Sequence, residues 1–268
     1  MDNYSVLMSV YHKEKPEFLK QAVSSVMSQT IIPNDFVLVC DGPLTDELNS
    51  TISLLKEQYS CLNVIHLKEN KGLGEALSIG ITHTKNEIVM RMDSDDICLP
   101  YRAETQLPYL EKYDLVGGAI SEFEDNPKNI IGYRYVPENY NKIIKFAKKR
   151  NPFNHPTTMY KKELILKAGN YKTLLYLEDY YLWIRVLMMS DKVYNIQKIL
   201  VNMRSGREMR ARRSNKAARK SIKFLRKYMF ENKFINWFSY CWYSMIYGIV
   251  LSLPLSFKKS FYKRLHRK

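Results

Sequence analysis

Strand-like and helix-like segments alternate along the first third of the chain, and this order restricts the fold more than any other feature. The strand-like segments show little alternation of polar and apolar residues, as in strands that are buried on both faces. They comprise residues 4–10, 36–39, 63–67 and 87–92. Between them, apolar residues recur with helical spacing after Pro16, after the N-cap candidate Thr45, and up to His83. We therefore expect an α/β fold with a Rossmann-like, mostly parallel sheet flanked by helices.

Polar residues follow three of these strands at the point where each strand ends. Ser9, Val10 and Tyr11 end the first strand, Asp41 follows the second, and the run from Asp93 to Asp96 follows the fourth. Open parallel sheets bind ligands beyond the carboxyl ends of their strands. These positions therefore predict a ligand site at one edge of the sheet.

Three carboxylates, those of Asp93, Asp95 and Asp96, stand within four residues after the fourth strand. Like charges this close raise one another's pKa, and a hard divalent cation held by carboxylate oxygens relieves the repulsion. The run is thus a candidate metal and phosphate site. Two alternatives stay open, an acidic turn in solvent and a role for Asp96 that is limited to capping the next turn.

Two common nucleotide-binding motifs do not account for this edge. The sequence contains no Gly-x-x-x-x-Gly-Lys-Ser/Thr run, so a P-loop is excluded. The turn at Gly72 and Gly74 begins like a dinucleotide fingerprint, but Leu77 occupies the third glycine position and the turn follows the third strand. This argues against a Rossmann dehydrogenase, and a tight turn with positive φ is the alternative role for these glycines.

Positive charge is concentrated in the last quarter of the chain. Residues 1–203 carry 24 Lys and Arg against 25 Asp and Glu, whereas residues 204–268 carry 18 against 2. A near-neutral body with a basic tail predicts a separate partner for the tail. The four cysteines have irregular spacing, which indicates neither a zinc site nor a disulfide framework.

An ordered set of short motifs over roughly residues 4–215 resembles the family-2 glycosyltransferases. The motifs of the first half are Ser9-Val10-Tyr11, Cys40-Asp41-Gly42, Asn70-Lys71-Gly72-Leu73-Gly74, Arg91-Met92-Asp93-Ser94-Asp95-Asp96 and Leu99-Pro100-Tyr101-Arg102. Those of the second half are Asn154-His155-Pro156-Thr157-Thr158-Met159, Gly169-Asn170-Tyr171 and Leu177-Glu178-Asp179-Tyr180-Tyr181-Leu182-Trp183. The resemblance implies the GT-A fold and use of a nucleotide-diphosphate sugar. It divides the body into a nucleotide-sugar half, residues 1–100, and an acceptor half, residues 101–203.

The resemblance also implies roles for residues of the donor half. Asp41 would accept a hydrogen bond from the base, which suits uracil or thymine, and Asp93 and Asp95 would hold Mn²⁺ or Mg²⁺ against the diphosphate. A metal there neutralises charge on the leaving group. The nucleotide-sugar-binding candidates are Ser9, Val10, Tyr11, Asp41, Asn70, Lys71, Gly72, Arg91, Asp93, Ser94 and Asp95.

In the acceptor half, the resemblance implies that Asp179 is the general base of an inverting transfer and that Glu178 orients a neighbour or the acceptor. Both acids would also suit the start of a helix, where the dipole stabilises them. His155 and two arginines after the last predicted strand, Arg204 and Arg207, are candidates for the acceptor or leaving-group side. A packed structural role is the alternative for the histidine.

The basic tail, residues 204–268, combines cations with an uncharged segment at 234–257. Serines and Pro254 interrupt that segment, and a single span would conflict with the positive-inside tendency. The stripe of Ile222, Leu225 and Met229 beside Lys and Arg suits a helix lying on anionic lipid. We expect peripheral attachment to the inner face of the cell membrane, with a re-entrant or partner-buried arrangement of the uncharged segment left open.

Many members of the family extend glycans on polyprenyl-diphosphate carriers for bacterial capsule, exopolysaccharide or O-antigen. The resemblance therefore implies a hexosyl- or N-acetylhexosaminyl-transferase with a UDP-sugar donor and a glycan or lipid-linked acceptor. One alternative is a sugar nucleotidyltransferase, but residues 11–16 lack the expected glycines. Another is a nucleic-acid- or membrane-binding protein with a degenerate transferase fold, which would leave Asp41, Asp95 and Asp179 without a purpose.

Overall fold

The computed structural model describes residues 3–205 and 216–252. Four parallel strands form its first half, in the spatial order β3-β2-β1-β4. Their bounds are β1 (Ser5–Val10), β2 (Asp35–Cys40), β3 (Leu62–His66) and β4 (Ile88–Arg91). These strands confirm the predicted ones with small differences at their ends.

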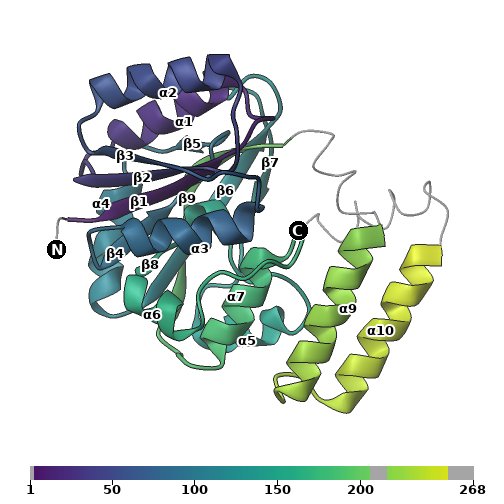
Figure 1. Cartoon of the computed structure of the whole chain (residues 1–268). Helices are drawn as coiled ribbons and strands as arrows, with labels where there is room; N and C mark the ends of the chain where they lie inside the picture. Colours follow the sequence, from purple (N-terminus) through teal and green to yellow (C-terminus); the bar gives the residue numbers. More distant parts are fainter. Residues whose placement is uncertain (1–2, 206–215, 253–268) are drawn as a thin grey trace.

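Three helices connect these strands and cover both faces of the sheet (Figure 1). Helices α1 (Pro16–Met27) and α2 (Asp46–Gln58) lie on one face, and α3 (Leu73–His83) lies on the other. Pro16 occupies the first turn of α1, where its missing N–H is not needed. The Thr45 hydroxyl accepts the Leu48 N–H at 3.3 Å and caps α2, as its position predicted.

Alternation along the strands divides the core into two layers. Val6 and Met8 of β1 pack in the cluster that contains the buried residues of α1 and α2. Leu7, between them in sequence, points to the opposite cluster with Leu77 of α3 and Trp183. Because both layers are apolar, β1 is buried except at the half-buried Ser9, which explains why apolar residues occupy both faces of the strand between Ser5 and Ser9.

The second half of the sheet mixes parallel and antiparallel pairs, whereas β1 to β4 are all parallel as predicted. Strand β8 (Met159–Lys161) is antiparallel to both β4 and β6 (Leu115–Phe123). Strand β9 (Val193–Arg204) runs parallel to β6, and two further strands, β5 (Ile97–Cys98) and β7 (Ile130–Arg134), pair antiparallel to β9 and β6. The described residues thus form a nine-stranded sheet. Strands as short as β5 and β8 give no detectable periodicity, and the prediction came from residues 4–92 alone.

Short helices surround this second half. They are α4 (Arg102–Gln106), α5 (Tyr140–Ala147), α6 (Lys162–Lys167), α7 (Glu178–Leu187) and the 3₁₀ turns η1 (Leu107–Glu111) and η2 (His155–Thr157). Helix α7 is buried on almost every side, and Trp183 at its centre is fully buried. All four cysteines are free.

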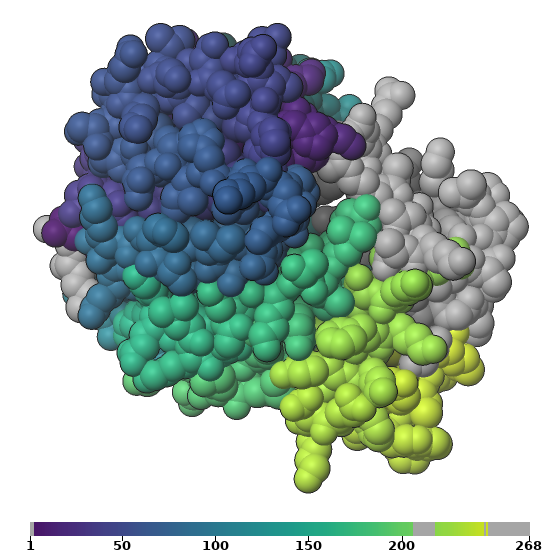
Figure 2. Space-filling view, in the orientation of Figure 1, coloured from purple at the N-terminus to yellow at the C-terminus, as the bar shows by residue number. Residues whose placement is uncertain are grey.

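A helical hairpin, α9 (Lys216–Glu231) and α10 (Trp237–Ser252), packs beside α7 and α5 (Figures 1 and 2). Leu225 and Met229 of α9 are buried in the same cluster as Trp183, and Arg226 donates to the Lys149 carbonyl at 3.0 Å. The interpretation of the α9 apolar stripe as a lipid-facing surface is therefore wrong, because the stripe packs on the body of the protein.

No helix within residues 3–205 and 216–252 is long and apolar enough to span a bilayer. Helix α10 covers 16 residues of the uncharged segment, and residues 253–257 lie outside the described ranges. The tail therefore consists of a hairpin whose first helix packs on the body of the protein, and of residues outside the described ranges. Its membrane association remains a prediction.

Candidate functional site

The carboxyl ends of four strands meet at one edge of the sheet and bring most of the predicted site residues together. Ser9 and Val10 end β1, Asp41 follows β2, Arg91 ends β4 and Arg204 ends β9. The strands run in the same direction, so their ends share an edge. The acidic run after β4 lies between the ends of β1 and β9.

Asp41 ties the end of β2 to the turn that precedes α3. Its two carboxylate oxygens accept the backbone N–H groups of Lys71 at 2.7 Å and Gly72 at 2.9 Å. The Asn70 amide donates to the Asp41 carbonyl at 3.0 Å. Asp41 is buried, and each of its oxygens keeps a further lone pair. The turn predicted from its glycines exists, with Gly72 at φ +85°.

The acidic run is held in place by contacts on both sides. The Arg91 guanidinium, buried under the loop, forms an ion pair with the Asp93 carboxylate. Ser94 donates to Glu14, in the loop after β1, at 2.6 Å. Asp96 is buried and accepts the Arg204 backbone N–H at 2.8 Å. The loop is therefore a fixed structure that concentrates carboxylates, and the interpretation as an unconstrained turn in solvent does not describe it.

Negative charge in this loop is only partly compensated. Burial, with the nearby carboxylates of Asp93 and Glu14, raises the pKa of Asp95 to about 7. Burial and the Asp95 carboxylate raise the pKa of Asp96 well above its usual range. The second carboxylate oxygen of Asp96 is buried without a hydrogen-bond partner. A cation at the loop would favour the charged forms of these groups.

These features fit a divalent metal for which the protein supplies some of the ligands and a bound diphosphate would supply others. No group of three or more His, Cys, Asp and Glu side chains in the described part of the chain forms a complete metal site. Mg²⁺ is commonly held by one or two carboxylates, with waters and substrate phosphates as the other ligands. Asp93 and Asp95 suit this partial ligand set, and their role remains a prediction.

Arg204 supports the acidic loop from the end of β9. Its Nε donates to the Asp95 carbonyl at 3.0 Å, and its guanidinium lies 3.7 Å from the ring centroid of Phe18 and 4.6 Å from that of Phe123. A further bond, 2.9 Å long, reaches Gln21. These contacts fix the arginine behind the loop, where its charge offsets the carboxylates. Arg207 lies outside the described residues.

Glu178 and Asp179 form the first turn of α7, as the helix-start interpretation predicted. Asn151 donates to Asp179 Oδ2 at 2.5 Å. A Cβ added at Gly74 would lie 3.0 Å from Glu178 Cγ, so the start of α7 abuts the start of α3. Burial raises the pKa of Glu178 to about 7. Glu178 therefore lies near the turn that precedes α3. The roles of Glu178 and Asp179 in transfer remain predictions.

His155 lies in the core beneath this region. Its Nε2 is 3.1 Å from the Tyr171 hydroxyl, and its ring packs against Trp183 with centroids 5.9 Å apart. Burial, and secondarily the Arg91 charge, holds its pKa well below the usual range. These are the contacts of a neutral packed histidine, the alternative left open by the sequence. Its role toward an acceptor remains a prediction.

Sequence reasoning missed two polar residues in this arrangement, Glu14 and Asn151. Glu14 bonds Ser94 and raises the pKa of Asp95, and Asn151 bonds the candidate base. Glu14 follows the first strand, so its position at the carboxyl edge was a usable signal. Asn151 lies in the segment after α5, and no local pattern connects it to a residue 28 positions away.

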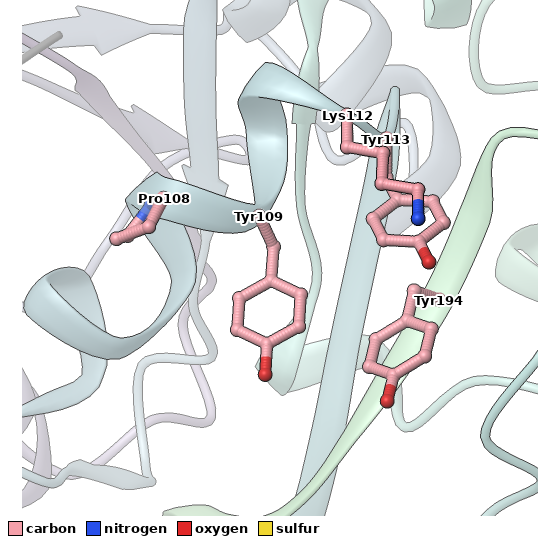
Figure 3. A pocket seen from close by; sticks show the side chains of 5 residues that line it. All are labelled: Pro108, Tyr109, Lys112, Tyr113 and Tyr194. Carbon is pink, nitrogen blue, oxygen red and sulfur yellow. The ribbon is translucent and has the colours of Figure 1, made fainter.

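A separate hollow of about 280 Å³ lies at the opposite end of β6 and β9 (Figure 3). The rings of Tyr109, Tyr113 and Tyr194 stack there with centroids 5.0 to 6.5 Å apart. Tyr113 precedes β6, and Tyr194 is near the start of β9. The hollow therefore lies away from the acidic loop and is not part of the candidate site.

Comparison with known proteins shows the family to which the chain belongs. The model of the family described as glycosyl transferase family 2 matches residues 5–167, which include the Asp41 turn and the acidic loop. The chain belongs to glycosyl transferase family 2. It is a glycosyltransferase, so the alternative of a sugar nucleotidyltransferase is set aside.

Curated relatives agree with this assignment. An uncharacterized glycosyltransferase of Haemophilus influenzae is 41% identical over 213 residues, covering 78% of this chain and 79% of its own. The amylovoran biosynthesis glycosyltransferase AmsE of Erwinia amylovora is 38% identical, covering 77% of each chain. An Escherichia coli UDP-Gal:alpha-D-GlcNAc-diphosphoundecaprenol beta-1,3-galactosyltransferase is 35% identical, covering 99% of this chain and 97% of its own.

Solved structures confirm the GT-A fold. Residues 1–349 of S. aureus TarS in complex with UDP-GlcNAc superpose with a TM-score of 0.68 at 16% identity, covering 95% of this chain and 77% of that one. The Pyrobaculum calidifontis mannosyltransferase PcManGT, in complex with GDP-Man and Mn²⁺, gives a TM-score of 0.61 at 18% identity, covering 82% and 64%. At these identities the likeness concerns the fold alone.

Proposed function

We propose that the protein is an inverting, metal-dependent glycosyltransferase that moves a sugar from a UDP-sugar to a lipid-diphosphate-linked glycan during assembly of a bacterial surface polysaccharide. The observation that carries this proposal is the acidic loop, fixed at the carboxyl edge and short of positive charge. Of the structures with a similar fold, that of TarS contains UDP-GlcNAc and that of PcManGT contains GDP-Man and Mn²⁺, which supports a donor of this class.

The donor side follows from the contacts around Asp41 and the loop. The Asp41 carboxylate and the 70–72 turn would hold the nucleoside, with the remaining lone pair of the carboxylate accepting an imide N–H of uracil. Asp93 and Asp95 would hold Mn²⁺ or Mg²⁺. When bound, the metal neutralises negative charge on the departing diphosphate. Arg204 keeps the loop in its shape while that charge develops.

The acceptor side follows from the first turn of α7. The Asp179 carboxylate would take the proton of the acceptor hydroxyl as the oxygen attacks the anomeric carbon. The bond from that carbon to the diphosphate oxygen breaks, and the new glycosidic bond forms on the opposite face of the sugar. Asn151 would hold the Asp179 carboxylate in the orientation that receives the proton. Glu178, with a pKa of about 7, would be partly protonated and could donate to the acceptor.

The acceptor class is supported by two of the relatives. One is named for transfer to GlcNAc-diphosphoundecaprenol and matches this chain over almost its full length, and another is named for amylovoran biosynthesis. A lipid-linked acceptor places the reaction at a membrane surface. The cations of residues 204–268 then favour an anionic membrane as the partner of the tail, at the inner face of the cell membrane.

The direct test is a transfer assay with a synthetic GlcNAc-diphosphate-lipid acceptor and separate UDP-sugars, with Mn²⁺ or with EDTA. We expect one UDP-sugar to give an elongated acceptor, detected by mass spectrometry, only when metal is present. Asp179→Asn should abolish transfer while UDP still binds. Metal-independent transfer, or full transfer by Asp179→Asn, would contradict the proposal.

A further inference from the structure

The outer face of helix α10 carries an exposed band of large apolar side chains. Phe238 is 75% exposed, Trp237 58%, Trp242 57% and Met245 50%. On a helix with 3.6 residues per turn, positions 238, 242 and 245 fall within about 60° of one another. The whole of α10 contains no charged residue. Contiguous apolar surface of this kind marks an interaction site.

The opposite face of α10 holds the hairpin together. The rings of Tyr240 and Phe230 stack with centroids 5.0 Å apart, and the Arg226 guanidinium lies 4.7 Å from the Tyr243 ring centroid. Arg226 also bonds the body of the protein through the Lys149 carbonyl. The apolar band is therefore held outward on a helix whose inner face is already in contact, which Figure 1 shows as the outermost layer beside α9.

The chemistry around the band selects its partner. On α9, the side that faces away from the buried residues Leu225 and Met229 carries exposed Arg219, Lys220 and Lys223. Phe224, which follows Lys223 directly, is 49% exposed. Exposed tryptophans beside a cationic surface are typical of helices that lie in the headgroup region of anionic bilayers. A protein partner would not need this combination.

We propose that the α9–α10 hairpin is a membrane-docking surface that inserts the α10 band into an anionic bilayer, with the α9 cations on the phosphate headgroups. This inference deepens the proposed function, because a lipid-linked acceptor requires the active site to work at a bilayer. It moves the lipid contact from the α9 stripe, which is buried, to α10. It needs no spanning helix.

The first test is sedimentation with vesicles of phosphatidylglycerol and phosphatidylcholine, compared with vesicles of phosphatidylcholine alone. Full burial of one large apolar side chain corresponds to about tenfold or more in partitioning. We expect Phe238→Ser/Trp242→Ser to weaken binding to the anionic vesicles at least tenfold. The matched control, Ile32→Ser/Leu54→Ser, removes side chains that are 58% and 65% exposed on the body, and should bind like the parent.

Charge is tested in the same assay. Lys220→Glu/Lys223→Glu should weaken binding to anionic vesicles about tenfold or more, whereas Lys56→Glu, an exposed position on α2, should not. Salt should weaken the parent's binding in the same direction. An equal loss for both sets of variants would contradict a specific role for α9.

Tryptophan fluorescence gives a second readout. Trp237 and Trp242 are exposed, and the third tryptophan, Trp183, is fully buried. Anionic vesicles should therefore shift the emission to shorter wavelength in the parent, and Trp237→Phe/Trp242→Phe should lose the shift.

Three results would overturn the proposal: no binding to anionic vesicles, unchanged binding by Phe238→Ser/Trp242→Ser, or a concentration-dependent dimer that this variant dissociates. The last would show that a second copy covers the band. Vesicle binding requires no donor, so a protein that docks but transfers no sugar would refute the proposed function and leave this inference intact.

Discussion

Replacing Asp95 by Asn should stabilise the metal-free protein at alkaline pH. The folded pKa of this carboxyl is about 7, against an ordinary value of 3.8. The folded state favours the protonated form of this carboxyl. The free energy of unfolding therefore falls as pH rises from about 4 to about 7 and the carboxyl loses its proton. A difference of about three pKa units corresponds to at most about 4 kcal/mol. Asparagine is neutral and similar in shape, so it removes the free-energy cost of ionising a buried carboxyl.

The assay is thermal unfolding in EDTA at pH 5 and pH 8. For a chain of this size about 2 °C accompanies each kcal/mol, so Asp95→Asn should raise Tm by up to about 8 °C at pH 8 and by much less at pH 5. Asp191→Asn, at an exposed position, is the control and should change neither value. An equal Tm for parent and Asp95→Asn at pH 8, or an equal rise at both pH values, would refute the electrostatic argument.

Four further variants test other parts of the account. Asp179→Asn should lower kcat by about 10² or more while UDP affinity is retained, and normal turnover would remove Asp179 from the mechanism. Asn151→Ala should lower kcat with little change in KM for the donor and should alter the pH profile of kcat, since Asn151 bonds the carboxylate of the proposed base, Asp179; an unchanged profile would assign it a purely structural role. Gly42→Ala should destabilise more than Gly72→Ala in denaturant unfolding, because both have φ +85° but only at Gly42 would a Cβ meet backbone, 2.5 Å from Asn70 N; equal losses would contradict the close-packing argument.

The first half of the fold was accessible from sequence because its apolar strand-like runs alternate with segments of helical spacing that carry start signals. Helix α1 begins at Pro16, and the Thr45 cap fixes the start of α2. The second half depends on pairings between β4, β8, β6 and β9, which are distant in sequence. No local sequence pattern reveals partners this far apart, and β8 has only three residues, so the mixed sheet became visible only in three dimensions.

The candidate site divides in the same way. Asp41, Asp93 and Asp95 follow strands, and their common edge follows from the parallel arrangement. The contacts that hold these side chains in place cannot be predicted from strand order. Arg204 reaches the acidic loop over 109 positions, and Asn151 reaches Asp179 across a loop. For the α9 stripe, the sequence predicted a contact with lipid that the structure replaces by a contact with protein. Amphipathic spacing cannot distinguish a face that packs on protein from one that meets lipid.

The measurement that tests the central claim most directly is thermal unfolding with UDP, with and without Mn²⁺, for the parent and Asp95→Ala. Ligand at about 100 times its Kd adds about 2.7 kcal/mol, or roughly 5 °C for a chain of this size. The account predicts a rise of this size for the parent only when UDP and Mn²⁺ are both present, and no rise for Asp95→Ala. An equal rise without metal, or in Asp95→Ala, would contradict a metal-bound diphosphate at the acidic loop.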